Sequence, residues 1–250
     1  MDQFATKLDE YQRIIERDYQ MRIDFIADYV EGAGAAGVVV GISGGIDSAV
    51  AAALAVKALG AERVLGIWMP VYSDSRHFAD AKFLAEQIGI ELITIDLTDG
   101  YNVLVEEFSE HGELDDVVKG NIKARMRMTA LYTIAGQHRY LVSDTCNYSE
   151  LYIGYMTKGG DGLADYNPLA TLTKHQLRLL AAYLKLPDKI INKTPSADLW
   201  EGQTDEGEMG FSYYELDRYL LTGEGNPMVI KRIETLHRIS EHKRNLIPGV

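Results

Sequence analysis

The chain has 250 residues, of which 46% are hydrophobic and 25% charged, so it can form one globular domain with a sizeable core. Its net charge of −12 argues against a nucleic-acid partner, because nucleic-acid phosphates would be repelled without a strong local basic patch. The single cysteine, Cys146, excludes an intramolecular disulfide and fits a reducing compartment. The first residues lack a signal-peptide pattern and no apolar run approaches about 18 residues, so we expect a cytoplasmic protein that does not bind membranes.

Helix and strand patterns alternate along the first 143 residues. The predicted strands are 37–42, 64–69, 91–96 and 140–143, and the predicted helices are 4–31, 48–59, 76–88, 99–109 and 117–137. This alternation favours an α/β fold with a doubly wound, mostly parallel sheet that carries helices on both of its faces.

Beyond about residue 145 the pattern is less regular, and helices are predicted over 173–185, 212–221 and 227–242. The stretch 200–210 is acidic, polar and rich in glycine. It is compatible with a solvated loop and equally with a mobile lid over a site.

A glycine-rich turn joins the first predicted strand to the next helix. Backbone N–H groups and the positive end of a helix both favour an anion at such a turn, and serine hydroxyls add donors. A carboxylate in the same turn would repel phosphate unless a cation stands between them, which predicts Mg²⁺ held jointly with a phosphate chain. The residues of this turn are Gly41, Ile42, Ser43, Gly44, Gly45, Ile46, Asp47 and Ser48.

A second carboxylate follows the fourth predicted strand. In an open α/β sheet, ligands bind beyond the carboxyl ends of the strands where the strand order reverses. If the first and fourth strands are neighbours there, Asp47 and Glu150 converge and can hold Mg²⁺ together with phosphate oxygens. Taken alone, Glu150 could equally be a surface carboxylate in the first turn of a helix.

The turn 41–48 is not a Walker A loop, because no lysine follows Gly45. It resembles the Ser-Gly-Gly-x-Asp-Ser signature of the PP-loop ATP pyrophosphatases, which split ATP between the α and β phosphates. Further runs, spread with the turn over roughly residues 36–245, resemble NAD synthetase in order and spacing. These runs are 119–128, 154–162, 167–169, 193–199 and 240–244.

The resemblance implies a five-stranded sheet of the adenine nucleotide alpha hydrolase-like type and a single domain over 1–250 without a glutaminase domain. It also implies that deamido-NAD is adenylated by ATP with release of pyrophosphate, and that ammonia then displaces AMP to give NAD. Since the only thiol lies within the ATP-site motif, free ammonia is the expected nitrogen donor unless a separate subunit delivers it. Members of the family resemble stable homodimers.

The resemblance also implies roles for individual residues. The turn 41–48 would bind ATP together with Thr145, Lys174 and Ser196, and Asp47 and Glu150 would bind Mg²⁺. The set expected to contact deamido-NAD is Arg125, Lys158, Asp165, His242 and Lys243. Asp47, Lys158 and Asp165 are the expected catalytic residues, and the individual tasks of Lys158, Asp165 and Lys174 stay open.

Simpler interpretations exist for several of these residues. Lys123, Arg125 and Arg127 could form one solvated basic helix face, Lys174 could be an ordinary first-turn residue, and His242 and Lys243 could be charges at a helix C-terminus. Cys146 is expected to be a packed residue, because acyl-adenylate chemistry needs no thiol. A GMP-synthetase-type module, a tRNA-modifying PP-loop enzyme and a nucleotide-sensing module are the alternative functions.

Overall fold

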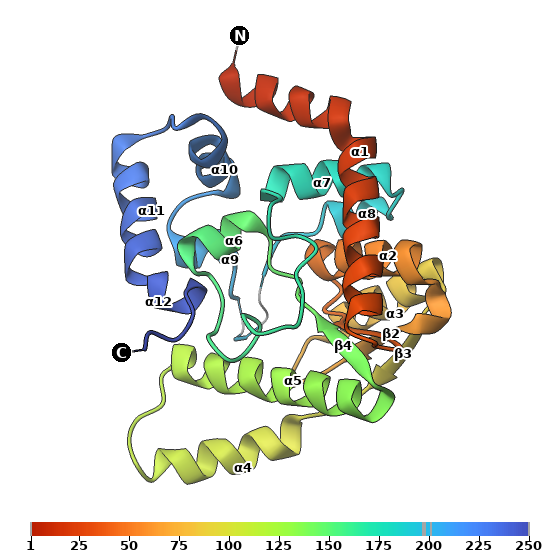
Figure 1. The fold of residues 1–250 in the computed structure, drawn as a ribbon. Helices are drawn as coiled ribbons and strands as arrows, with labels where there is room; N and C mark the ends of the chain where they lie inside the picture. The colour runs from red at the N-terminus through yellow and green to blue at the C-terminus, as the bar shows by residue number, and fades with distance from the viewer. Residues whose placement is uncertain (1, 197–198, 201, 250) are drawn as a thin grey trace.

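The computed structural model describes residues 2–196, 199–200 and 202–249. Its centre is a parallel sheet of β1 (Gly37–Gly41), β2 (Val64–Trp68), β3 (Glu91–Thr94) and β4 (Tyr140–Ser143). The strand order is β3-β2-β1-β4, so β1 has β2 on one side and β4 on the other (Figure 1). The chain therefore reverses its direction of winding at β1, and the predicted α/β class and doubly wound sheet are confirmed.

The sheet of the described residues has four strands, so the expectation of five is wrong by one strand. Beyond β4 the chain forms only an isolated parallel bridge between Ser143 and Tyr166. Asp165 N donates to Val142 O at 3.0 Å and Asp144 N donates to Tyr166 O at 2.8 Å. The pairing stops two residues later because Pro168 has no N–H to continue a ladder.

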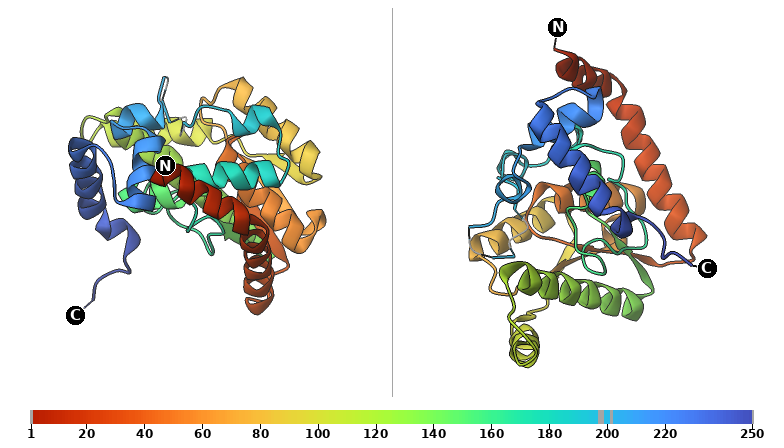
Figure 2. Two further views of the ribbon diagram at one scale, coloured as in Figure 1. Left: turned by 90° about the horizontal axis from the view of Figure 1, so that it is seen from above. Right: turned by 90° about the vertical axis from the view of Figure 1, so that its left-hand side faces the viewer.

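Helices cover both faces of the sheet, as the alternating pattern predicts. Val38 and Val40 point into a large apolar cluster, and Val39 points to the opposite face. The first cluster is shared with α1 (Gln3–Gly32), α2 (Ile46–Leu59), α3 (Ser75–Ile88) and α7 (Lys174–Tyr183). The other face packs against α5 (Asp116–His138), with α4 (Thr98–Ser109) beyond it (Figure 2).

η1 (Ala61–Arg63) leads directly into β2 at the amino edge of the sheet. The remaining helices lie at the carboxyl edge and beside the sheet. They are α6 (Tyr148–Ile153), α8 (Asp188–Ile191), α9 (Asp205–Met209), α10 (Tyr213–Thr222), α11 (Pro227–Ile239) and α12 (Glu241–Arg244). A separate apolar cluster holds α6, α10 and α11 together through Ile153, Leu216 and Ile233. None of the helices that the structure describes is long and apolar enough to cross a lipid bilayer.

The stretch 200–210 is not a plain solvated loop. Thr204 caps the short helix α9, and the side chains of Gln203, Asp205 and Met209 are buried. Residue 201 lies outside the described residues, as do 197 and 198 of the run 193–199. Burial of α9 brings an acidic side chain toward the carboxyl edge of the sheet.

Candidate active site

The glycine-rich turn wraps tightly between β1 and α2. Ser43 N donates to Ser48 Oγ at 3.3 Å, and Ser48 Oγ donates to Gly45 O at 3.1 Å. At Gly44, where φ is 75°, an added Cβ would lie 2.7 Å from His77 O of α3, so only glycine fits. Gly45 is the N-cap residue of α2 and has no side chain to cap it, which leaves first-turn N–H groups for an anion.

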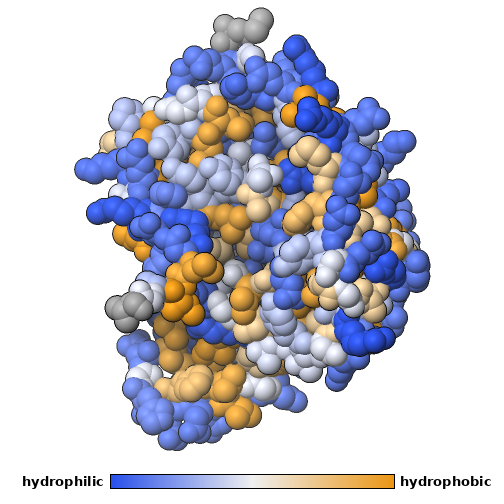
Figure 3. Space-filling view, in the orientation of Figure 1, coloured by the Kyte–Doolittle hydropathy of each residue, from blue (hydrophilic) through white to orange (hydrophobic). Residues whose placement is uncertain are grey.

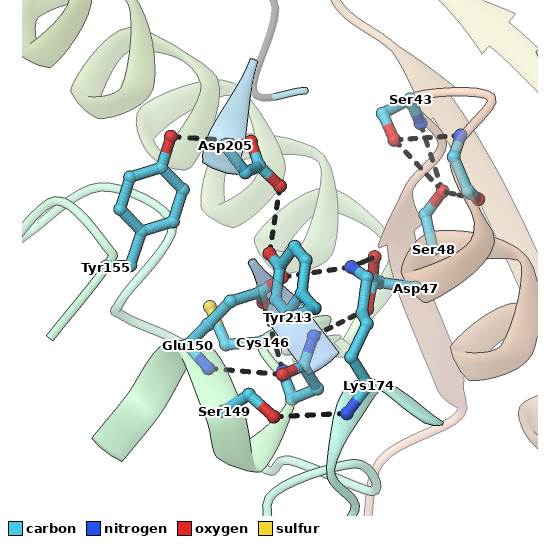
Figure 4. A network of polar contacts seen from close by, with 12 residues as sticks. Ser43, Asp47, Ser48, Cys146, Ser149, Glu150, Tyr155, Lys174, Asp205 and Tyr213 are labelled. Carbon is cyan, nitrogen blue, oxygen red and sulfur yellow. Dashed lines mark hydrogen bonds and ion pairs between the residues drawn. The ribbon is translucent and has the colours of Figure 1, made fainter. Parts of the chain in front are cut away.

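Asp47 and Glu150 meet on one ammonium group. Lys174 Nζ lies 2.6 Å from Asp47 Oδ2 and 3.1 Å from Glu150 Oε1 (Figure 4). Lys174 is the first residue of α7 and only 1% exposed. Because β1 and β4 are neighbours at the reversal of strand order, the three side chains project into one place, as the sequence predicts for the two acids.

These two carboxylates fit a magnesium ion. They already share one cation, the Lys174 ammonium, and carboxylate oxygens are ligands that Mg²⁺ prefers. In the described part of the chain, no three His, Cys, Asp or Glu side chains converge as a complete metal site. Asp47 and Glu150 would therefore need further ligand oxygens, which a bound phosphate chain can supply.

Asn147 links the two acids, and the sequence analysis missed it. Its side chain is fully buried and donates to Asp47 Oδ1 at 2.8 Å. It also accepts from Glu150 N, while Asn147 N donates to Glu150 Oε2, which is a capping box at the start of α6. The spacing Asn-x-x-Glu is the signal that could have revealed it.

Two tyrosines and a third carboxylate complete the polar network. Tyr213 Oη lies 2.9 Å from both Glu150 Oε1 and Asp205 Oδ2, so the two carboxylates share its one hydroxyl hydrogen, and Lys174 Nζ lies 4.8 Å from the Tyr213 ring centroid. Tyr155 Oη donates to Asp205 Oδ1 at 3.3 Å. Figure 4 shows Asp205 and Tyr213 directed toward the Asp47, Lys174 and Glu150 group. Asp205 belongs to α9 and Tyr213 to α10, far along the chain from the two acids, and no local sequence pattern marks either residue.

Burial sets the protonation behaviour of the site. It raises the pKa of Glu150 to about 7, although Lys174 opposes the shift. Burial also raises the pKa of Asp205. For Lys174, burial favours the neutral amine, but Asp47 and Glu150 outweigh it and hold its pKa above the ordinary value. The ammonium therefore stays charged between its acids.

A cavity opens in front of this group and is lined by most residues of the turn 41–48. Thr145, Lys174 and Ser196, the other residues predicted to bind ATP, also line it. Its apolar wall includes Ile67 and Leu131. Gly44 does not line the cavity, because it turns toward α3.

The only cysteine of the chain is packed, as expected. Cys146 is buried beside the same cavity, and its Sγ donates to Asp161 O at 3.6 Å. Burial raises the pKa of its thiol well above the ordinary value, so the thiol stays protonated and is a poor nucleophile.

Four of the five residues predicted to contact deamido-NAD form a second group around the loop 154–162. Lys158 Nζ donates to His242 O at 2.8 Å, and Arg125 Nε donates to Lys158 O at 3.4 Å. Lys243 Nζ donates to Gly154 O at 2.8 Å and to a second carbonyl of the loop. None of the four lines the cavity, which reaches this loop at residues 155, 160 and 161.

Asp165, the fifth residue, is held elsewhere. Its Oδ2 accepts from Val142 N at 2.7 Å, and its Oδ1 accepts from Tyr132 Oη at 3.2 Å. Asp165 thus lies against the end of β4, apart from the group around the loop 154–162.

The basic residues of α5 do not form one solvated face. Lys123 is buried and donates to Leu199 O at 2.7 Å, and Arg127 donates to Met69 O at 3.1 Å. Arg125 alone of the three is exposed. The interpretation of this cluster as solvated surface is therefore wrong for two of its three members.

Lys193 is a further basic residue at the cavity that the sequence analysis did not single out. Its Nζ donates to Gly44 O at 3.1 Å and to Asp80 Oδ2 of α3 at 2.8 Å. It therefore ties the segment before residue 197 to the glycine-rich turn and to α3.

Fold and site together define a nucleotide-binding protein of the doubly wound α/β class. A sequence profile described as NAD synthase matches residues 18–247. The NH3-dependent NAD+ synthetase of Carboxydothermus hydrogenoformans is 43% identical over 233 residues, which are 92% of this chain and 96% of that protein. The chain belongs to the NAD synthase family.

Two solved structures are similar to this chain over most of its length. The NMN synthetase of Francisella tularensis superimposes with a TM-score of 0.89 at 39% identity and covers 94% of this chain and 98% of that one. The NH3-dependent NAD synthetase of Campylobacter jejuni has a TM-score of 0.79 at 29% identity, with the same shares of the two chains covered.

Proposed function

We propose that this protein is an ammonia-dependent NAD synthetase, a ligase that forms an amide from the nicotinate carboxylate of deamido-NAD at the expense of ATP. The arrangement that carries this proposal is the Asp47, Lys174 and Glu150 group beside the glycine-rich turn. Membership of the NAD synthase family supports it, and no finding favours a GMP-synthetase-type module, a tRNA-modifying enzyme or a nucleotide sensor.

In the first step, an oxygen of the nicotinate carboxylate attacks the α-phosphorus of ATP, and the bond to the β-phosphate oxygen breaks to release pyrophosphate. A carboxylate is a poor electrophile, and adenylation gives it a good leaving group. The N-terminus of α2 and the hydroxyls of Ser43 and Ser48 would bind phosphate oxygens, and Lys174 would neutralise their charge. Asp47 and Glu150 would hold Mg²⁺, which when bound offsets negative charge on the phosphates.

In the second step, ammonia attacks the carbonyl carbon of the adenylate, the bond from that carbon to the phosphate oxygen breaks to release AMP, and one N–H proton is lost to solvent to leave the amide. Arg125, Lys158, His242 and Lys243 would hold the dinucleotide near the loop 154–162. Lys158 can neutralise the dinucleotide pyrophosphate or the reacting carboxylate. Asp165 can accept hydrogen bonds from a ribose hydroxyl or an ammonium ion with oxygens that Val142 and Tyr132 orient.

Free ammonia is the proposed donor, and residues 1–250 are proposed to act as one domain. The relative from Carboxydothermus hydrogenoformans is named NH3-dependent, and this chain covers 96% of its length. We also propose a homodimer. Ile14, Met21, Phe25 and Tyr29 lie at helical spacing on α1 and are exposed, so they offer an apolar stripe for a second copy.

A second candidate is amidation of the mononucleotide, nicotinate mononucleotide, to NMN. The observation in its favour is the TM-score of 0.89 with the NMN synthetase of Francisella tularensis. Both substrates present the same nicotinate carboxylate, so the phosphate-binding turn and the acids serve either reaction. The two substrates differ in that only the dinucleotide carries an AMP half.

The test is incubation of purified protein with ATP, Mg²⁺ and ammonium and with either deamido-NAD or nicotinate mononucleotide. We expect equal amounts of AMP and pyrophosphate to accompany NAD from the dinucleotide, and no product when glutamine replaces ammonium. A higher kcat/KM for the mononucleotide would favour the second candidate. If pyrophosphate is released with neither deamido-NAD nor nicotinate mononucleotide, both candidates are contradicted.

A further inference from the structure

A buried carboxylate from α10 lies directly behind the Asp47, Lys174 and Glu150 group. Asp217 is fully buried, and its Oδ1 accepts a hydrogen bond from Ser149 Oγ. Its Oδ2 accepts from His175 N at 2.8 Å and is 2.7 Å from His175 Nδ1. These three contacts with the protein replace the solvent lost around the carboxylate, so they fix the position of the Asp217 side chain.

The partners of Asp217 are the chain neighbours of the two proposed active-site residues. Ser149 precedes Glu150 in α6, and His175 follows Lys174 in α7. Lys174 N also donates to Ser149 Oγ at 3.1 Å, a bond visible in Figure 4. One carboxylate thus holds the start of α6 and the start of α7 against each other.

The placement agrees with the electrostatics of a helix start. The first N–H groups of α7 have no partner within the helix, and they meet Ser149 Oγ and Asp217 Oδ2 instead. A negative charge at this end also interacts favourably with the helix dipole. The His175 ring is held in addition by edge contacts with Phe4 and Tyr214, with the Phe4 centroid 5.3 Å away.

We propose that Asp217 is a positioning residue for the reaction: it fixes Glu150 and Lys174 in the geometry in which the Lys174 ammonium lies between Glu150 and Asp47 and faces the phosphate site. The inference rests on the proposed function and deepens it. Asp217 does not line the cavity that is proposed to hold ATP and the reacting carboxylate. Its effect arises because a displacement of about 1 Å at an active-site residue can reduce turnover by about 100-fold.

A merely structural role predicts a different result. The neighbouring Leu216 is fully buried in the cluster of α6, α10 and α11, and its apolar side chain makes none of the hydrogen bonds described above. Leu216→Ala therefore destabilises the same helix by leaving a cavity, but it keeps the hydrogen bonds that hold Ser149 and His175 beside Glu150 and Lys174. It is the matched control.

The experiment compares wild type, Asp217→Asn, Ser149→Ala, their double variant and Leu216→Ala at a temperature well below every Tm. Binding of MgATP is measured by isothermal titration calorimetry, and turnover by pyrophosphate release. We expect Asp217→Asn and Ser149→Ala each to weaken MgATP binding and lower kcat by about tenfold or more. The double variant should be no worse than the worse single variant, because the two residues act as one unit. Leu216→Ala should lower Tm with kinetic constants near those of wild type.

The proposal is overturned if Asp217→Asn lowers Tm but keeps wild-type MgATP binding and kcat, or if its effects and those of Ser149→Ala add independently. Should Asp217→Asn fail to fold, Ser149→Ala and His175→Gln test the same contacts, and unchanged MgATP binding in both overturns it. Failure of the proposed function looks different, because then the wild type itself releases no pyrophosphate with either nicotinate substrate.

Discussion

Lys174 shows how a residue can serve the site before any ligand binds. Its ammonium is buried between Asp47 and Glu150 and keeps two carboxylates together that would otherwise repel each other. A buried group of paired charges adds little to the free energy of unfolding, but removal of one member leaves the other charges buried without a partner. The charge balance at these three residues therefore links stability to cation binding.

Lys174→Met should destabilise the protein by about 3 kcal/mol, because both acids lose their cation. Added Mg²⁺ without ATP should raise the Tm of the variant more than that of wild type, since the ion can replace the ammonium. Differential scanning fluorimetry with Mg²⁺ or with a chelator measures this. Lys193→Met is the control, because its partner Asp80 is only partly buried and the loss should stay below about 1 kcal/mol. Equal Mg²⁺ responses in all three proteins would contradict the shared-cation site.

The raised pKa of Glu150, about 7, predicts an acidic limb in the activity profile. Below this pH the carboxyl is protonated and neutral, so cation binding and kcat/KM for MgATP should fall as the pH decreases through about 7. Higher Mg²⁺ should move the limb to lower pH, because the ion competes with the proton. Rate profiles at two Mg²⁺ concentrations check this.

Glu150→Gln should lose most activity at every pH, and Glu91→Gln, at an exposed position on β3, should keep the wild-type profile. If the acidic limb of the activity profile stays at the same pH when the Mg²⁺ concentration changes, the titrating group is not Glu150.

At the scale of elements, two short helices depend on their N-terminal caps. α6 has six residues, too few to be stable in isolation, and its capping box joins Asn147 to Glu150. α7 begins with a second capping box between Thr173 and Gln176. Because each cap lies next to an active-site side chain, the start of the helix and the geometry of the site are determined by the same hydrogen bonds.

Asn147→Ser separates these two roles. Serine keeps an oxygen that can cap α6 but has no amide to donate to Asp47, so stability should change by less than about 1 kcal/mol. The KM for MgATP should nevertheless rise by about tenfold, because Asp47 loses its orienting bond. Asn226→Ser, at the exposed N-cap of α11, is the matched control and should leave KM unchanged. A large stability loss with unchanged KM would limit Asn147 to its capping role.

At the scale of the whole molecule, apolar surface remains uncovered. The stripe on α1 is one such region, and apolar side chains also gather over α4 and α5 low on the face shown in Figure 3. On α1 the exposed residues follow a single helical stripe beside the one that packs on the core, through Ile15 and Ile26. This continuity supports an interface with a second copy.

Met21→Glu should dissociate the proposed dimer, because it places a charge in the centre of the stripe. Light scattering after size exclusion should give twice the chain mass of 27.9 kDa for wild type and the single chain mass for the variant. Glu16→Lys changes a charge on another face of α1 and should remain dimeric. A wild-type protein that is monomeric at micromolar concentrations would refute the dimer.

Much of the fold and part of the site could be predicted from local patterns. The strand, turn and helix around residues 37–59 lie where hydrophobic runs and glycines place them, and the alternation of elements implied neighbouring strand ends. The prediction of a fifth strand was wrong because pairing beyond β4 is limited to one bridge, which Pro168 cannot extend without an N–H group. α9 escaped notice because its composition is polar, and its burial comes only from contacts with distant residues.

The sequence by itself determined the glycine-rich turn and the two acids, because residue type and spacing encode local backbone shape and chemical capacity. Lys174 was indicated only by the resemblance to NAD synthetase. Only the tertiary structure decided that Lys174 sits between the acids, that Tyr213 and Asp205 close the network, and that Asp217 braces it from behind. Those contacts join residues many positions apart, and their geometry follows from packing of whole helices against one another. No local pattern contains that information.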